Sequence, residues 1–326
     1  MKKILICGAT GFIGRNLTEY FAEKEGFEVY AVWHKNASFE ISKVNWLQGD
    51  LRNTDDVERM VKGMDIIVQA AATTSGSKDI VNRPYIHVTD NAVMNSLLLR
   101  AAFDHHIENF VFFSCTVMYQ SSEKALSEVD FDASEELHPR YYGVGWTKIY
   151  VEKMCEFFSK LGRTKHTVIR HSNIYGPYDK YDLERSHVFG ATVTKVMNAK
   201  DKIVVWGTGE EERDLLHVDD LVQFVEKSFE KQKSNYELFN CGLGEAVSIL
   251  QLVETMVSLS KKRIQIEHDL SQPTIKTSLF LDCGKAKQLL EWTPTVDLET
   301  GIQRTLKWYR ENVLNAEGVC EKTKNV

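Results

Sequence analysis

The chain has 326 residues, of which 43% are hydrophobic and 26% are charged, and its formal net charge is -6. This length accommodates one large domain or two modest ones, and the composition is ordinary for a globular protein. The negative charge argues against a general nucleic-acid binder, which usually presents a basic face. No apolar run approaches the roughly 20 residues of a membrane span, so we expect no membrane partner.

The six cysteines show neither a CxxC pair nor a regular spacing. We therefore expect reduced thiols and a cytoplasmic protein. A strand is predicted from residue 3, which leaves little room for a targeting segment. We predict no metal site, because His105-His106 lacks partner spacing and fits a surface turn. Asp219-Asp220 could suggest a metal pair, but an N-cap and first-turn carboxylate of a helix explains it better.

The first half of the chain alternates short apolar runs with longer segments of helical periodicity. The runs predict strands at 4–7, 29–32, 66–68, 110–113 and 167–169, and the periodic segments predict helices at 12–21 and 88–103. Alternation of this kind indicates βαβ units and a parallel sheet.

Three glycines, Gly8, Gly11 and Gly14, are spaced GxxGxxG between the first strand and the first helix. This arrangement lets the backbone turn tightly, approach a pyrophosphate and aim a helix N-terminus at its charge. The flanking strand and helix are the context that such a motif requires. The sequence thus predicts a Rossmann-type dinucleotide-binding unit, and a structural turn without a ligand is the alternative.

The end of the second strand carries Trp33-His34-Lys35-Asn36, without a carboxylate. An acidic residue there would bind ribose hydroxyls and favour NAD, whereas a cation can meet a 2′-phosphate. We therefore favour NADP over NAD. The alternative is that His34 and Lys35 are solvated loop residues.

After Arg170 the regular alternation of apolar runs and helical segments ends. Gly176-Pro177 predicts a turn, and the polar segment 178–185 a surface loop. Helices are then predicted at 221–229, 249–259 and 298–312, followed by a polar tail from residue 315.

In this order the elements resemble the extended short-chain dehydrogenase/reductases, the NAD-dependent epimerase/dehydratase family, which act on nucleotide sugars. The matching elements downstream of the glycine turn are Gly49-Asp50-Leu51, Ala70-Ala71-Ala72, Asn91, Arg170 with Asn173 and Tyr175-Gly176-Pro177, and the run from Arg213 to Asp220. Within the family, Ser186-His187-Val188 and Trp206-Gly207-Thr208-Gly209 are most similar to the GDP-fucose synthases.

The resemblance implies an α/β fold, a Rossmann-type doubly wound parallel sheet with a smaller mixed α/β substrate lobe. We expect residues 1–170, with 217–245 returning, to bind the dinucleotide, and 171–216 with 246–314 to bind the nucleotide sugar. Residues 315–326 would form a flexible tail. The family commonly dimerises through two long helices, here near 88–103 and 149–161, so we expect a homodimer.

The resemblance also assigns binding residues. The implied cofactor-binding residues are Gly8, Thr10, Gly11, Phe12, Ile13, Gly14, His34, Lys35, Asp50, Leu51, Ala70, Ala71, Ala72, Asn91, Ser114, Lys148 and His171. The implied substrate-binding residues are Thr73, Asn173, His187, Val188 and Arg213.

Family members exchange the hydroxyl proton through a tyrosine spaced YxxxK with a lysine, because positions i and i+4 share one helix face. Lys148 fits that lysine, with Glu152 four residues later, but Val144 occupies the tyrosine position. Tyr142 lies six residues from Lys148, on the opposite side of a regular helix. Either intervening glycines let Tyr142 enter the site irregularly, or a water or another group carries the proton.

The hydroxyl position after the fifth predicted strand is altered as well. Cys115 occupies it, and a shift of one residue would place Thr116 there. Cys115 could act as an acid or base, or be a small buried thiol. His187 matches the acid of sugar epimerisation, and a place beside a surface helix N-cap is its alternative.

The sequence therefore predicts an NAD(P)-dependent enzyme that acts on a nucleotide sugar, with a GDP-sugar favoured. The reaction would be oxidoreduction or epimerisation at or near C4 by hydride transfer. A non-catalytic dinucleotide-binding redox sensor or assembly protein is the alternative, and the missing tyrosine is its main support.

Overall fold

The computed structural model describes residues 1–73, 84–183, 186–271 and 278–315. Its main sheet has seven strands in the order β11-β6-β5-β4-β1-β2-β3, and every pairing within it is parallel. The strands are β1 (Lys2–Cys7), β2 (Phe27–Trp33), β3 (Val44–Gln48), β4 (Ile66–Gln69), β5 (Asn109–Ser114), β6 (Lys165–His171) and β11 (Tyr236–Cys241). The order reverses between β1 and β4, which is where doubly wound sheets bind ligands.

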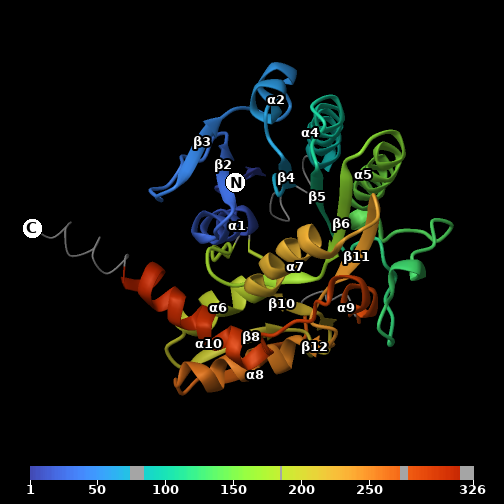
Figure 1. Ribbon diagram of the computed structural model, residues 1–326. Coiled ribbons are helices and arrows are strands. Elements are labelled where there is room, and N and C mark those ends of the chain that lie inside the picture. The colour runs from blue at the N-terminus through green and yellow to red at the C-terminus, as the bar shows by residue number, and fades with distance from the viewer. Residues whose placement is uncertain (74–83, 184–185, 272–277, 316–326) are drawn as a thin grey trace, which may run out of the picture.

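Helices cover both faces of this sheet (Figure 1). One face carries α1 (Phe12–Glu23), α7 (Val218–Lys231) and α9 (Gly284–Leu290). The other carries α2 (Thr54–Val61), α4 (Pro84–Asp104) and α5 (Tyr142–Leu161). In β1, Ile4 and Ile6 enter the first core and Leu5 and Cys7 the second, so its apolar run serves both faces. The predicted Rossmann-type doubly wound fold is confirmed.

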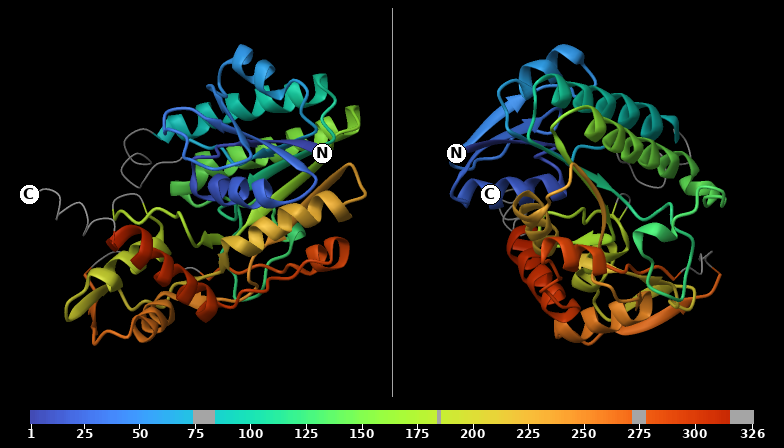
Figure 2. Two further views of the ribbon diagram at one scale, coloured as in Figure 1. Left: turned by 60° about the vertical axis from the view of Figure 1, so that its left-hand side comes forward. Right: turned by 45° about the vertical axis from the view of Figure 1, so that its right-hand side comes forward.

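A smaller layer lies beyond the carboxyl ends of the strands (Figure 2). In its described residues it contains three two-stranded sheets and a separate apolar core. Its strands are β7 (Asn173–Tyr175), β8 (Lys202–Trp206), β9 (Glu212–Arg213), β10 (Leu215–His217), β12 (Val247–Ser248) and β13 (Gln265–Asp269). Its helices are α6 (Val188–Asn198), α8 (Ile249–Ser260) and α10 (Leu298–Tyr309), with a π-helical turn, η3, at Arg310–Leu314.

Two local predictions need correction. The segment predicted as a surface loop is only partly at the surface, because the Asp179 side chain is buried and Tyr181 packs on Trp308. Glu184 and Arg185, at the end of that segment, lie outside the described residues. So does the predicted flexible tail beyond Asn315.

The predicted N-cap at Asp219-Asp220 is the second correction. The N-cap of α7 is His217, which accepts a hydrogen bond from the Asp219 amide, so Asp219 and Asp220 both lie inside the first turn.

Candidate cofactor and substrate site

The glycine turn has the geometry that a pyrophosphate requires. Gly8 has a φ of +74°, and a Cβ on it would come within 2.6 Å of the Ala71 Cα atom. A Cβ on Gly14 would lie 2.1 Å from the Gly8 carbonyl oxygen, so glycine is required there for close packing of α1 on the turn. The N-cap of α1 is Gly11, and no side chain caps this helix end. The α1 amides therefore fit a phosphate ligand.

A charged cluster borders the end of β2. Arg52 donates to both carboxylate oxygens of Asp50, at 3.0 and 2.7 Å, and to Asp90 at 2.7 Å. These hydrogen bonds lower the pKa of Asp50 to about 2. His34 Nε2 lies 3.6 Å from Asp50, and Lys35 is exposed on the following loop. Sequence reasoning missed Arg52, although it directly follows the Gly49-Asp50-Leu51 element.

Three predicted cofactor ligands turn their side chains elsewhere. Leu51 is 7% exposed and belongs to the apolar core, so its side chain does not face a ligand. The Asn91 amide accepts from Thr73 N at 2.9 Å and donates to Thr73 O at 3.1 Å, so it positions the loop after β4. Ser114 is fully buried and its hydroxyl donates to Glu152 at 2.5 Å. These side chains therefore make their contacts within the protein, and direct contact of the three residues with the cofactor stays a prediction.

The remaining cofactor candidates line the turn and the neighbouring strand ends. Thr10, Phe12 and Ile13 are half-buried at the start of α1. Ala70 and Ala71 lie against Gly8, and Ala72 is exposed beside them.

Lys148 is fixed at the carboxyl end of β5. Its Nζ atom donates to the Phe113 carbonyl oxygen at 2.6 Å and lies 4.8 Å from the centre of the Phe112 ring. Burial lowers the pKa of Lys148, and the neighbouring Cys115 and Glu152 oppose this shift. The ammonium group is thus held at the carboxyl ends of the strands, which is also the end of the sheet where the glycine turn follows β1.

Tyr142 is not brought to Lys148. Helix α5 begins at Tyr142 and includes both glycines, so the irregular entry considered from the sequence does not occur. Tyr142 is 61% exposed and packs edge-on against Trp146. Val144, one helical turn before Lys148, occupies the corresponding face of the helix.

Cys115 and Thr116 follow β5 directly, and both are half-buried. Burial raises the pKa of the Cys115 thiol, whereas the Lys148 charge and a hydrogen bond from the Val117 amide lower it. Cys115 also packs beside the cluster of Met118 and Ile149. It is therefore both a packed thiol and a direct neighbour of the lysine.

Two histidines lie near this region: His171 ends β6 of the main sheet, and His187 belongs to the smaller layer. His171 Nδ1 lies 2.7 Å from the Ser172 carbonyl oxygen, and burial lowers the pKa of His171 to about 4, with smaller contributions from Lys148 and His187. His187 is the N-cap residue of α6, and its side chain makes no capping hydrogen bond. Val188 is the first residue of this helix. The surrounding protein and the Lys180 charge lower the pKa of His187.

Arg213 occupies the short strand β9, and its Nη1 atom donates to the Glu212 carbonyl oxygen at 2.7 Å. Burial lowers the pKa of Arg213, while Tyr141 and Glu211 act in the opposite direction. Tyr141 ends the 3-10 helix η2 (Pro139–Tyr141), and sequence reasoning gave it no role. Asn173 Nδ2 donates to the Asp214 carbonyl oxygen at 3.2 Å, close to Arg213 in the chain.

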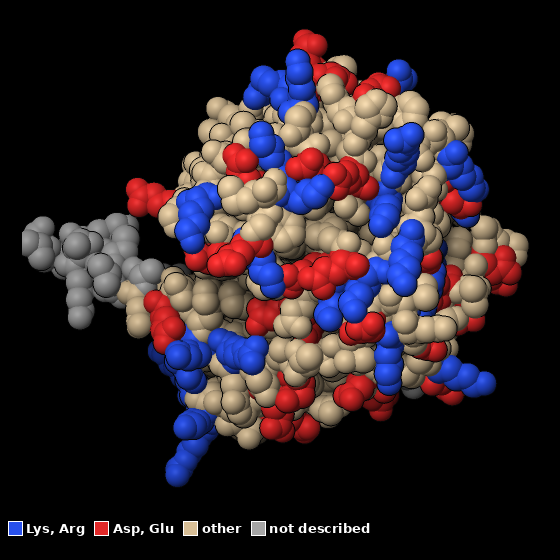
Figure 3. Space-filling view, viewed as in Figure 1, with Lys and Arg blue, Asp and Glu red and all other residues tan. Residues whose placement is uncertain are grey.

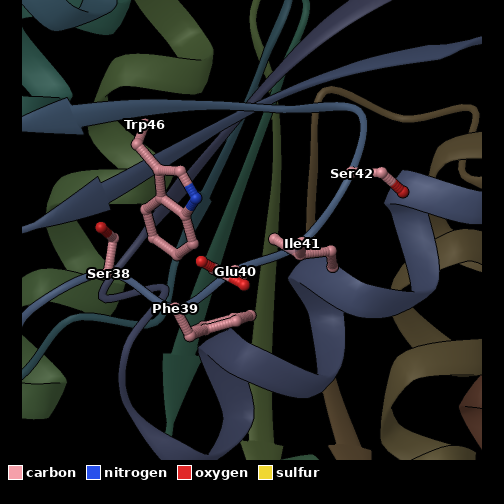
Figure 4. A pocket seen from close by; sticks show the side chains of 6 residues that line it. All are labelled: Ser38, Phe39, Glu40, Ile41, Ser42 and Trp46. Carbon is pink, nitrogen blue, oxygen red and sulfur yellow. The ribbon is translucent and has the colours of Figure 1, made fainter.

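Other surface features bear less directly on this site. Basic and acidic side chains are interspersed on the face shown in Figure 3. A pocket of about 570 Å³ is lined by residues 38–42 of the loop that follows β2 and by Trp46 of β3 (Figure 4). No helix in the described residues is long and apolar enough to cross a membrane. The described ranges also contain no group of three or more His, Cys, Asp or Glu side chains that could hold a metal ion.

Residues 4–242 match the model of the NAD dependent epimerase/dehydratase family, and the chain belongs to that family. It is similar to GDP-L-fucose synthase of Azorhizobium caulinodans, with 27% identity over 94% of this chain and 96% of the relative. It is also similar to GDP-L-colitose synthase of Yersinia pseudotuberculosis, with 25% identity over 94% and 97%.

A reductase and a solved structure extend these comparisons. The dTDP-4-dehydro-6-deoxy-D-allose reductase of Streptomyces bikiniensis shares 26% identity over 95% of this chain and 97% of the relative. The structure of UDP-glucose 4-epimerase of Thermotoga maritima superposes with a TM-score of 0.83, at 23% identity, over 95% of this chain and 99% of that one. This likeness confirms the fold.

Proposed function

We propose that the protein is an NAD(P)-dependent nucleotide-sugar oxidoreductase or epimerase that acts at or near C4, with a GDP-sugar as its substrate. The observation that carries this proposal is the Lys148 ammonium, held on the Phe113 carbonyl beside Cys115 at the strand ends that the glycine turn faces. The names of two similar relatives, GDP-L-fucose synthase and GDP-L-colitose synthase, support the GDP-sugar.

The bound dinucleotide would supply or accept the hydride. Lys148 would hold its nicotinamide ribose, and the α1 amides its pyrophosphate. We favour NADP because the nearest carboxylate to the end of β2, Asp50, is already paired with Arg52. His34, Lys35 and Arg52 would then face a 2′-phosphate.

The substrate would lie between the strand ends and the smaller layer. Arg213 would bind the diphosphate, and Asn173, Thr73 and Val188 would line the sugar. Cys115 or Thr116 would hydrogen-bond the reacting sugar oxygen. Because Tyr142 points away, a water or the Cys115 thiol would exchange the hydroxyl proton. His187 would donate a proton if the ring is epimerised.

We assign residues 1–170 and 217–245 to dinucleotide binding and residues 171–216 and 246–314 to the nucleotide-sugar lobe. The strand β11 and the helix α7 support the return of the chain to the first unit, because both pack with the main sheet. We also propose a cytoplasmic protein, which agrees with the free state of the described cysteines.

A homodimer through α4 and α5 is part of this proposal. These neighbouring helices expose large apolar side chains on their outer surfaces, which is unusual for a helix face directed at water. The exposed side chains are Tyr85, Val93, Tyr150, Phe157 and Leu161.

The second candidate is a non-catalytic dinucleotide-binding sensor or assembly protein, which Val144 at the tyrosine position favours. A direct experiment separates the two. The purified protein is given NADPH or NADH with GDP-, UDP-, dTDP- and CDP-sugars, and the nicotinamide absorbance and product formation are followed. Enzymatic function predicts turnover with one sugar class. Dinucleotide binding without affinity for any nucleotide sugar would leave the sensor as the better account.

A further inference from the structure

The side chain of Arg15 lies between two aromatic rings that belong to different parts of the protein. Its guanidinium carbon is 4.1 Å from the centre of the Phe39 ring and 3.8 Å from the centre of the Tyr178 ring. Both distances are well inside the roughly 6 Å range of cation–π attraction. Arg15 belongs to α1, just after the glycine turn. Phe39 lies on the loop that follows β2, and Tyr178 on the segment that follows β7.

This contact continues in both directions as a series of ring contacts. Phe39 packs edge-on against Trp46 of β3 with 4.9 Å between ring centres, and Tyr178 packs edge-on against Trp308 of α10, also at 4.9 Å. We call these five side chains, Trp46, Phe39, Arg15, Tyr178 and Trp308, the Arg15 stack. The stack thus connects the edge of the main sheet to the last helix of the smaller layer.

The Tyr178 end of the stack is held in a constrained conformation. Tyr178 has a φ of +70°, a strained conformation for a non-glycine residue that persists only where surrounding contacts enforce it. Asn16 of α1 donates to the Pro177 carbonyl oxygen at 2.9 Å, and Tyr181 donates to the Gly176 carbonyl oxygen at 2.7 Å. The Asn16 hydrogen bond attaches the segment after β7 to α1, and the Tyr181 hydrogen bond closes a turn within that segment.

The guanidinium is also fixed by charge. Arg15 Nε donates to Glu19, one turn further along α1, at 3.0 Å. Burial and a hydrogen bond to Glu19 raise the pKa of the Tyr178 hydroxyl. Glu19 therefore orients both the cation and one of its two rings.

The Phe39 end of the stack borders a pocket. Phe39 and Trp46 line the pocket of about 570 Å³ on this loop, together with Glu40 and Ile41 (Figure 4). The same loop begins with His34 and Lys35, which the proposed function places at the cofactor ribose.

We propose that Arg15 is a positioning residue that couples cofactor binding to nucleotide-sugar binding. This inference rests on the proposed function, because it assumes that each unit binds its ligand. Cofactor bound at His34 and Lys35 fixes the loop that carries Phe39. Phe39 holds the Arg15 cation, and the cation holds Tyr178 within residues 176–183, the described segment that follows Asn173 and β7. Each ligand then strengthens the binding of the other, since coupling of this kind is reciprocal.

The test measures the dissociation constant of NADPH by its fluorescence, with and without saturating GDP-mannose, in the full-length protein. The ratio of the two constants is the coupling factor. We expect about tenfold coupling in the wild type, within the range usual for linked sites. Arg15→Met retains the length of the side chain but removes the cation, and should bring the factor below about twofold while NADPH alone still binds. Arg15→Lys should restore part of the coupling.

Lys24→Met is the matched control. Lys24 is the C-cap residue of α1, and its ammonium group lies 5.6 Å from the centre of the Tyr20 ring and pairs with Glu226 of α7, outside the stack. Its coupling factor should equal that of the wild type. Phe39→Leu removes one ring without altering α1, and it should also lower the coupling factor. This variant keeps the test usable where Arg15→Met does not fold.

Several results would overturn the inference. Wild-type protein that binds both ligands without mutual effect would do so, and so would full coupling in Arg15→Met or Phe39→Leu. Failure of the proposed function has a different signature. There, wild-type protein binds NADPH, yet neither GDP-mannose nor UDP-glucose binds in the presence or absence of the cofactor.

Discussion

Arg170 forms a paired hydrogen-bonded salt bridge with Glu152, through Nε to Oε1 at 3.0 Å and Nη2 to Oε2 at 2.7 Å, and the two side chains are only 5% and 3% exposed. Arg170 belongs to β6 and Glu152 to α5, four residues after Lys148. Arg170 also donates to the Tyr119 hydroxyl at 3.0 Å, and Ser114 donates to Glu152. The pair therefore joins the end of β6 to the helix that carries Lys148, and Ser114 adds the end of β5.

Removing one member of this pair should be strongly destabilising. Glu152→Gln leaves the buried Arg170 charge without its counterion, and we expect a loss of about 3–5 kcal/mol in the free energy of unfolding. Denaturant unfolding measures this loss. The double variant Glu152→Gln with Arg170→Met should lose less than the sum of the single variants, because both charges are removed. Additive losses would show that the two side chains do not act as a pair.

The stability of the protein should also depend on Asp179. Burial raises the pKa of this carboxyl to about 7, and its Oδ2 atom has no hydrogen-bond partner among the described residues. The folded state therefore holds a proton that the unfolded state releases near pH 4, so this contribution to stability is full below about pH 4 and is lost as the pH rises to about 7.

Asp179→Asn removes that dependence. We expect the variant to be more stable than the wild type by about 1–3 kcal/mol at pH 8, with the difference vanishing near pH 4. Unfolding curves at several pH values check this. The exposed carboxylate of Glu299, replaced by Gln, provides a control with little expected effect. A variant less stable than wild type at pH 8 would contradict the prediction.

The proton-transfer roles can be separated by three substitutions. Tyr142→Phe should leave turnover within about twofold of the wild type, because the ring is exposed and Lys148 lies on another face of α5. Cys115→Ala and Thr116→Val should differ in their turnover. The variant that lacks the group holding the sugar oxygen should lose about 10²-fold or more in turnover. Steady-state kinetics with the preferred sugar measure all three. A hundredfold loss of turnover in Tyr142→Phe would assign the proton transfer to this tyrosine.

The proposed dimer surface can be tested with a single charged substitution. Phe157 of α5 is 56% exposed, and Phe157→Glu should produce monomers in light scattering at concentrations where the wild type is dimeric. Leu289→Glu on α9 changes a side chain that is 42% exposed, away from α4 and α5, and should not alter the mass. A monomeric wild-type protein would refute the proposed interface.

Much of the dinucleotide-binding unit was readable from the chain. Its buried strands are continuous apolar runs, because parallel strands covered on both faces need apolar side chains throughout. The edge strand β3 and the helix α2 were not found, since β3 is only partly buried and α2 is rich in acidic residues. The short strands of the smaller layer also have too few residues to show a period.

The sequence by itself determined the glycine turn, the sheet and the family, because these depend on local spacing along the chain. It also showed that Val144 replaces a tyrosine before Lys148. Only the tertiary structure decided where the side chains point. Tyr142 faces away from Lys148 because α5 is regular through its two glycines, and Ser114 turns to Glu152 because a buried carboxylate needs donors. Arg15 meets Phe39 and Tyr178 only because segments distant in the chain converge on α1, which no local pattern encodes.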